Sequence, residues 1–267
     1  EAVVFGLQRV VRWGCPSGAY GEPVLGRGVR GAAQTREAMA AVHRRLYGDN
    51  GGVLALCGGA DVRQVKEGSA AGAVAQLGAI EEAPPPPALA VQPGLHRIKV
   101  PRLESARLLM LWGLPPASDL HGVMGADLLT TVLAEGRRSR LVERLREQLR
   151  IVESIDLDLH VMESGSFALL EAICEADELG AVHRAIAQVW AELQEQGLTK
   201  LEWLRAQRLV ANGYRFGLEA AGGLAGLIGN NRLWGRHQAL ALPLAEIESW
   251  SSQDLLGQVV PLLDPSR

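Results

Sequence analysis

The sequence predicts an α+β fold, in which an antiparallel-rich sheet carries helices on one face. The alternating run Ile151 to His160, followed by Ser166 to Glu175 across a turn at residues 163–165, is typical of a hairpin of two strands. Apolar residues at spacings of three and four then indicate amphipathic helices. One such helix is marked by Leu179, Val182, Ile186, Val189 and Leu193.

The elements before this hairpin complete the predicted sheet. Leu95 to Val100 and Ala106 to Gly113 read as strands, and Ser118 to Ala134 and Ser139 to Leu149 read as helices. Together with the hairpin they give the order strand, strand, helix, helix, strand, strand, after which helices dominate. This block begins at about Leu95.

The N-terminal block has a different composition of elements. Helical patterns are expected at Ala2 to Trp13, at Thr35 to Tyr47 and from Asp61 onward, with one buried strand at Val53 to Cys57. A lone strand cannot make a sheet. We therefore expect this block to pair with the rest of the chain or with a partner.

A proline-rich segment separates the two blocks. It contains four consecutive prolines, residues 84–87, which favour extended polyproline II and donate no backbone hydrogen bonds. A semi-rigid spacer is the favoured interpretation, and a proline-rich docking ligand is the alternative. The segment 81–94 is predicted to be the linker.

Composition narrows the classes of function. The chain has 267 residues, is 48% hydrophobic and carries 27 basic against 30 acidic residues, so it offers no global positive field for nucleic acid. No apolar run approaches the roughly 20 residues that span a bilayer, and no signal peptide is apparent, so we expect a soluble chain with the cytoplasm slightly favoured. Because the sequence begins with Glu1, further residues are expected upstream. Cys15, Cys57 and Cys174 are expected to be reduced, buried thiols.

Catalytic motifs are scarce. Gly26, Gly28 and Gly31 have the spacing of a dinucleotide fingerprint, but a turn-rich segment precedes them where a strand is needed. The sequence contains neither a phosphate-binding Gly-x-x-x-x-Gly-Lys loop nor a Gly-x-Ser-x-Gly nucleophile motif. A nucleotide-binding enzyme is therefore a remote alternative.

The best candidate polar cluster is Asp156, Asp158 and His160. Strand alternation places these three side chains on one face, opposite the neighbouring apolar residues. They could bind a metal ion, although a solvated face is the more common arrangement. No two histidines stand three or four residues apart, so the simplest zinc site is missing. The face is predicted to meet water or a water-filled cavity.

The segment from Gly136 carries a resemblance to a known family. A glycine that permits a sharp turn, Ser139-Arg-Leu141, in which the serine can cap a helix, then Leu145-Arg-Glu147 and a strand resemble the second-domain signature of pitrilysin or insulinase-like zinc metallopeptidases. This is the inverzincin clan, which includes proteins like the mitochondrial processing peptidase. Residues 20–26 and 43–62 are similar to the closing part of the first domain in that family.

The resemblance implies a clamshell of homologous α+β domains around a peptide-binding chamber. Residues 1–80 would be the C-terminal part of a first pitrilysin-like domain, and residues 95–267 a second one. In active members, zinc is held by the histidines of His-x-x-Glu-His and a downstream glutamate, and the glutamate within the motif activates water. This chain lacks the motif, so it is expected to supply no catalytic residue, metal ligand or cofactor. Zinc is expected in an N-terminal part or a partner subunit.

The resemblance also implies substrate contacts. Second domains of the family supply an Arg and, seven residues later, a Tyr. Arg146 matches the first, whereas Glu153 stands in place of the tyrosine, and its carboxylate would repel a developing oxyanion. Arg146 could equally pair with nearby acids such as Glu143 or Glu153.

The implied function is that of a non-catalytic part or inactive subunit of a pitrilysin-like zinc metalloendopeptidase. It would shape a peptide-binding chamber or support a catalytic partner. The alternative is a structural or assembly subunit of a larger complex with no peptide substrate. The expected partners are a catalytic pitrilysin-like domain or subunit and unstructured peptides, within a homo- or hetero-oligomer.

Overall fold

The computed structural model describes residues 9–16, 19–22, 34–44, 52–59, 61–72, 88–100 and 103–266. The chain forms two compact units. Unit 1 comprises Glu1–Pro23, Pro86–Asn212 and Pro243–Arg267, and unit 2 comprises Val24–Pro85 and Gly213–Leu242.

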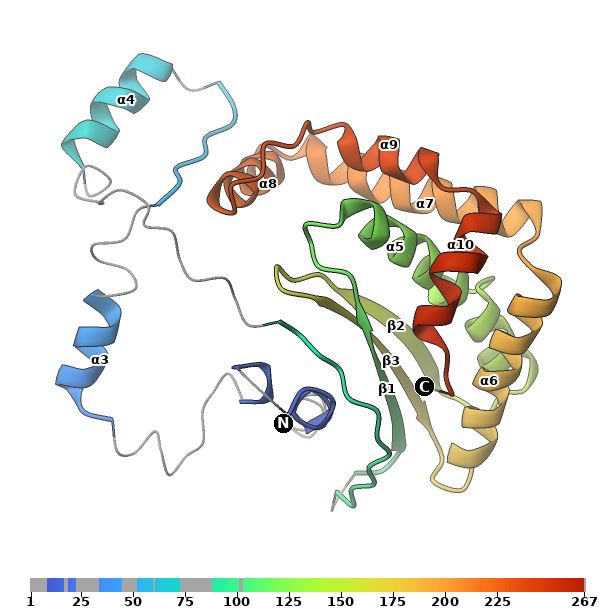
Figure 1. Ribbon diagram of the computed structural model, residues 1–267. Coiled ribbons are helices and arrows are strands. Elements are labelled where there is room, and N and C mark those ends of the chain that lie inside the picture. The colour runs from blue at the N-terminus through green and yellow to red at the C-terminus, as the bar shows by residue number, and fades with distance from the viewer. Residues whose placement is uncertain are drawn as a thin grey trace. The chain divides into compact units, whose positions relative to one another are not determined.

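Unit 1 is built on a three-stranded antiparallel sheet (Figure 1). Its strands are β1 (Ala106–Leu114), β2 (Ser154–His160) and β3 (Ser166–Cys174), in the order β1-β3-β2. The register places Trp112 of β1 opposite Ala168 of β3, which in turn lies opposite Leu159 of β2. Within the described sheet, β2 therefore has a neighbouring strand on one side only.

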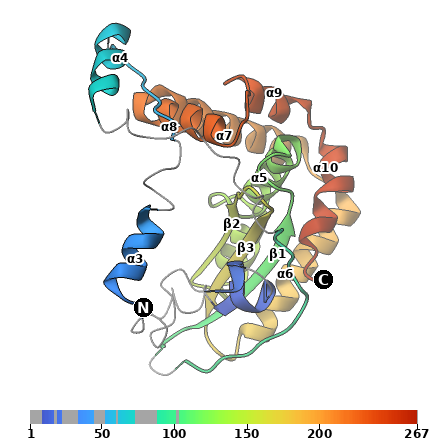
Figure 2. The same ribbon diagram turned by 60° about the vertical axis from the view of Figure 1, so that its left-hand side comes forward.

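Helices cover the apolar face of this sheet. Figures 1 and 2 show α5 (Leu120–Ala134), α6 (Leu179–Gln196) and α10 (Ser252–Gln258) on the same side of the strands. Side chains that alternate along the strands pack against these helices. The largest fully buried side chains are Trp190, Leu128, Leu129, Leu133, Leu141, Leu145, Leu170, Ile186, Leu193, Ile247, Leu255 and Leu263. Their burial supplies the main stabilising term of unit 1.

The remaining helical elements of unit 1 are short or shared. They are the 3-10 turn η1 (Ala19–Gly21), the π-helix η4 (Val142–Gln148), α9 (Leu242–Ser249) and the 3-10 turn η5 (Val260–Leu263). Helix α7 (Lys200–Glu219) begins in unit 1 and continues into unit 2.

The opposite face of the sheet meets the N-terminal segment. Residues 9–14 are helical, and residues 88–100 run beside β1 without joining the sheet (Figure 2). The amide of Gln92 donates to the Gly14 carbonyl at 2.6 Å, and that of Leu89 donates to the Ser164 carbonyl at 3.2 Å. A side chain at Gly113 would lie 3.3 Å from Val91. The close approach explains the glycine on β1.

The secondary-structure elements described in unit 2 are helices. Unit 2 contains α3 (Arg36–His43), α4 (Val62–Ala71), α8 (Ala221–Leu233) and the end of α7. Thr35 caps α3 by accepting from the Ala38 amide, and Asp61 caps α4 by accepting from the Arg63 amide. No described helix of either unit is long and apolar enough to span a bilayer.

The structure confirms the predicted α+β class, the strands that begin at Ala106 and Ser166, and the helices that follow them. The strand predicted from Ile151 is also present, but it begins at Ser154. Two predicted strands are wrong. Residues 53–57 form no strand, and Leu54 and Leu56 are more than half exposed. Leu95 to Val100 is also unpaired, with Leu95 96% exposed. Neither segment has a partner strand among the described residues, and an unpaired strand leaves its backbone groups unsatisfied.

Other predictions are corrected in detail or remain predictions. Cys15 and Cys174 are buried free thiols as expected, but Cys57 is exposed because the segment around it does not enter a core. The fingerprint at 26–31 and the prolines at 84–87 lie outside the described residues. The division of the chain at residues 81–94 stays a prediction.

Candidate functional site

A cleft lies between helix α5 and strand β2 of unit 1. Its volume is about 240 Å³. Its lining consists of Asp127, Thr130, Thr131, Ala134 and Glu135 from α5 and its C-terminal cap, and Asp156, Leu157, Asp158 and Leu159 from β2. Four acidic residues from two elements are therefore among the residues that line the cleft.

Local sequence explains how each element contributes. Along β2, Ile155 and Leu157 are buried in the core, whereas Asp156 and Asp158 point to the opposite face and are exposed. Along α5, the residues that line the cleft are three or four positions apart and so share one side of the helix. The predicted polar face of β2 is thus where alternation places it.

Asp127 is the most perturbed carboxyl group in the cleft. Burial, and secondarily the negative charge of Glu135, raise its pKa to about 6. Among the residues that the structure describes, none donates a hydrogen bond or ion pair to its side chain. A carboxylate that is desolvated without a counter-charge is costly to keep ionised.

The carboxyl of Asp156 feels a similar environment. Burial, the neighbouring Asp158 and Glu171 raise its pKa, and Arg146 acts in the opposite direction. The positive charge of Arg146 therefore acts on the polar face of β2, but its effect on the pKa of Asp156 is smaller than the combined effect of burial and the neighbouring acids.

Two threonines of α5 line the cleft. Thr130 and Thr131 are 6% and 7% exposed. The Thr130 hydroxyl donates to the Asp127 carbonyl at 3.0 Å. The Thr131 hydroxyl has no hydrogen-bond partner within the described part of the chain. Its hydrogen-bonding capacity is available to whatever enters the cleft.

Arg146 and Glu153 are not brought together. The Arg146 Nη2 and Nε atoms lie 2.8 Å and 3.1 Å from Oε1 of Glu147. Glu153 instead accepts a hydrogen bond from the Ser105 hydroxyl at 3.1 Å. The acid that pairs with Arg146 is thus Glu147, and not Glu143 or Glu153. Hydrogen bonds from Arg137 and Arg146 lower the pKa of Glu147 to about 2.

The predicted cluster of Asp156, Asp158 and His160 shares one face of β2 but does not converge on a point. The His160 ring stacks on Phe167 of β3, with centroids 4.5 Å apart. Within the described ranges, no group of three His, Cys, Asp or Glu side chains is arranged to hold a metal ion.

The segment from Gly136 to Leu141 has a structural role. Gly136 adopts φ +75°, a conformation that favours glycine. Ser139 is fully buried, and its hydroxyl donates to the Gly136 carbonyl at 2.6 Å, so it closes the turn and does not cap the next helix as predicted. Arg140 Nε lies 2.6 Å from Glu202 on α7, and its Nη2 donates to the Gly197 carbonyl.

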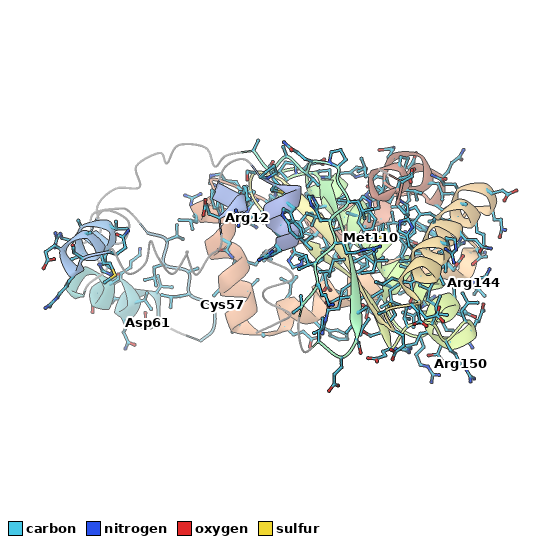
Figure 3. All side chains as sticks on the ribbon, turned by 90° about the horizontal axis from the view of Figure 1, so that it is seen from below. Arg12, Cys57, Asp61, Met110, Arg144 and Arg150 are labelled. Atoms are coloured by element: carbon cyan, nitrogen blue, oxygen red, sulfur yellow. The ribbon has the colours of Figure 1, made fainter. Side chains whose placement is uncertain are left out.

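Ion pairs also tie η4 to the helical layer. Arg144, labelled in Figure 3 at the α6 side of the molecule, has its Nη2 atom 3.3 Å from Glu192 of α6. Arg144 and Arg146 lie two positions apart on η4 and have different partners. This gives a matched pair of arginines for testing which of them acts on a ligand.

Sequence reasoning missed the α5 side of the cleft. The signal was present, because Asp127 is the one acid within the largely apolar helix from Leu120 to Ala134. Acidic side chains are rarely buried in a helix unless they are paired with another group. What the sequence could not reveal is that this helix runs beside β2.

Comparisons with known proteins address the whole chain. Residues 34–210 match the family described as "Peptidase M16 inactive domain". No curated protein matches the chain. The solved peptidase M16 inactive domain from Pseudomonas fluorescens has a similar fold, with a TM-score of 0.78 and 16% identity over 98% of this chain. A protease from Helicobacter pylori gives a TM-score of 0.73 and 16% identity over 98% of this chain and 69% of its own.

A chain in complex III2 from Candida albicans is also similar. The TM-score is 0.75, with 13% identity over 96% of this chain and 64% of that one. The present chain spans 63% of the Pseudomonas protein. At these identities the likeness concerns the fold.

Proposed function

Because this chain belongs to the family of peptidase M16 inactive domains, we propose that it is the non-catalytic part or inactive subunit of a pitrilysin-like zinc metalloendopeptidase. In this role it shapes a peptide-binding chamber or supports a catalytic partner. The observation that carries the proposal is the family match over residues 34–210, which covers the cleft and the polar strand beside it. Zinc belongs, in this proposal, to an N-terminal part outside this sequence or to a partner subunit.

The polar face of β2 is the surface we assign to the chamber. Asp156 and Asp158 are exposed there, and His160 is half-buried. Arg146, whose side chain is 38% exposed, directs its charge toward the same strand. Arg146 and Glu153 are the residues we propose to contact peptide substrate. An exposed polar strand beside a cleft supports this assignment, since an extended peptide can lie along such a strand.

The second candidate is a structural or assembly subunit without a peptide substrate. The similarity to a chain of complex III2 favours it, because that protein is part of a large assembly. The two candidates share the fold and the lack of catalysis. They differ in whether the polar face of β2 meets a peptide.

Peptide binding and complex formation together separate the candidates. The chain would be mixed with a candidate zinc-containing partner and examined by size-exclusion chromatography, and its affinity for an unstructured fluorescent peptide would be measured by anisotropy. The proposal predicts both a stable complex and peptide binding. A complex without peptide binding would support the assembly role. If the chain formed no complex and bound no peptide, both candidates would be refuted.

A further inference from the structure

We propose that residues 9–16 and 20–22 form a strap that covers part of the peptide-binding face of the sheet and detaches when an extended peptide occupies that part. This inference rests on the proposed function, because it concerns access to the face that we assign to the peptide. The strap and the sheet both belong to unit 1. Figures 1 and 2 show the helix of the strap on the side of the sheet away from α6 and α10.

The face of the sheet away from these helices has a polar half and an apolar half. Strand alternation puts Asp156 and Asp158 of β2 on this face, where both are exposed. In the register of the sheet, Leu169 of β3 lies between Asp158 and Leu111 of β1, so it shares their face. Leu169 is only 7% exposed, yet it is not part of the core beneath the helices. The apolar half of the face is therefore covered, whereas the polar half is open.

The strap lies over the apolar half. A Cβ atom added to Gly14 would lie 2.6 Å from Cδ2 of Leu111, so the backbone of the strap approaches β1 directly. The Gly14 carbonyl accepts a hydrogen bond at 2.6 Å from the amide of Gln92, in the segment that runs beside β1. Two chains cannot fill the same volume. A peptide is therefore restricted to the β2 side of the face while the strap is in place.

Side-chain contacts attach the strap to neighbouring loops. The Trp13 ring stacks on His96, with centroids 4.5 Å apart, and His96 is exposed. The hydroxyls of Tyr20 and Ser164 form a hydrogen bond. Within residues 9–16 and 20–22, Cys15 is the one buried side chain. A segment that buries so little and lies outside the strand ladder opens at a lower free energy than the core does. The strap can therefore leave the face while the sheet stays folded.

The cysteines of the chain can report this opening. Cys15 belongs to the strap and is 2% exposed, Cys174 is buried in the core beneath the helices, and Cys57 is exposed. Burial raises the pKa of the Cys15 and Cys174 thiols, which makes both slow to react while they stay covered. Alkylation of Cys15 thus measures detachment of the strap. Cys174 measures unfolding of the core, and Cys57 measures the activity of the reagent.

The test measures Cys15 alkylation and peptide affinity on the full chain. Alkylation by N-ethylmaleimide is followed by mass spectrometry. Binding of a short fluorescent glycine-serine peptide with two central leucines, which suit the apolar half of the face, is followed by anisotropy. In the wild-type chain, saturating peptide should speed the alkylation of Cys15 and leave Cys174 protected, because peptide and strap compete.

A substitution in the strap should act in the same direction. Trp13→Ala removes the stack on His96, so we expect faster alkylation of Cys15 and peptide binding about tenfold tighter, since the open fraction sets the apparent affinity. Trp234→Ala, the same change at an exposed tryptophan that follows α8, should alter neither quantity. If Trp13→Ala exposes Cys174 or leaves Cys15 protected, the wild-type comparison with and without peptide decides.

Failure of this inference is distinct from failure of the proposed function. The strap is refuted if Cys15 of the free wild-type chain reacts as fast as Cys57, or if saturating peptide leaves the alkylation rate of Cys15 unchanged. It is also refuted if Trp13→Ala exposes Cys15 without tightening peptide binding. In each case the bound peptide leaves the proposed function standing. Binding of the peptide by neither the wild-type chain nor the variant would refute the peptide-chamber role together with the strap.

Discussion

Asp127 links the chemistry of the cleft to the stability of the fold. Its folded-state pKa of about 6 lies above the ordinary value of 3.8, so the folded protein holds this proton more tightly than the unfolded chain. The stability that the protonated group contributes is present below about pH 4 and is lost as pH rises through about 6. At neutral pH the ionised Asp127 carboxylate therefore lowers the free energy of unfolding.

We predict that Asp127→Asn stabilises the protein at neutral pH. The substitution removes the buried charge but keeps the shape of the side chain, so the free energy of unfolding near pH 7.5 should rise by about 2 kcal/mol. Near pH 4 the difference from wild type should nearly vanish. Urea denaturation at both pH values measures the effect, with the exposed Asp177→Asn as control. An equal or lower stability at neutral pH would mean that the carboxylate has a partner in solution.

For Arg146, an effect on peptide binding can be measured separately from an effect on stability. If it contacts peptide, Arg146→Ala should weaken peptide binding about tenfold and change the melting temperature little, since its pair with Glu147 is partly exposed to solvent. Arg144→Ala on the same helix, which removes a pair with Glu192, should leave peptide affinity unchanged. If Arg146→Ala lowered the stability without lowering the affinity for peptide, the role of Arg146 would be structural.

The turn that begins at Gly136 is tied to helix α7. Arg140 joins this turn to α7 through Glu202, and both side chains are largely buried. Burial alone would raise the pKa of Glu202, but hydrogen bonds from Arg140 and Thr199 lower it to about 2. The pair therefore stabilises the fold above about pH 4.5, and this contribution is lost as pH falls toward about 2.

We predict that Arg140→Ala destabilises the protein by about 2 kcal/mol, because it leaves the Glu202 carboxylate partly buried without its counter-charge. Chemical denaturation near neutral pH measures the loss. Arg137→Ala is the matched control, since Arg137 is 78% exposed and should change stability little. Equal effects of the two substitutions would contradict the tie between the turn and α7.

The sheet shows which elements could be read from the sequence. Alternation at residues 151–160 identified β2 and its polar face, because one face of that strand is buried and the other meets water. Apolar runs at Val53 and Leu95 looked equally strand-like. A run becomes a strand only when a neighbour satisfies its backbone, and such pairing is not written in the run itself.

The candidate site was likewise predictable only in part. Asp156, Asp158 and His160 were predictable because strand periodicity places them together. The cleft was not, because its other wall is α5, far from β2 in sequence, and the packing of a helix against a strand edge depends on the whole core. Glu147 was not among the expected partners of Arg146, because adjacent residues of a helix do not ordinarily face each other.

At the scale of the whole molecule, the family membership predicted from the Gly136 segment is confirmed, including its non-catalytic portion. In this chain the signature residues form the turn and the tie with α7. They lie within the segment that matches the family. The function that we propose rests instead on the surface that the domain presents at the cleft and the polar face of β2.

The most direct test of the central claim is the rate at which a zinc-containing partner cleaves an unstructured peptide, measured with and without this chain. We predict no cleavage by this chain alone with zinc, and stimulation of the partner when the chain is added. A chain that cleaves peptides alone with zinc, or a partner whose rate is unchanged while it is saturated with this chain, would contradict the claim.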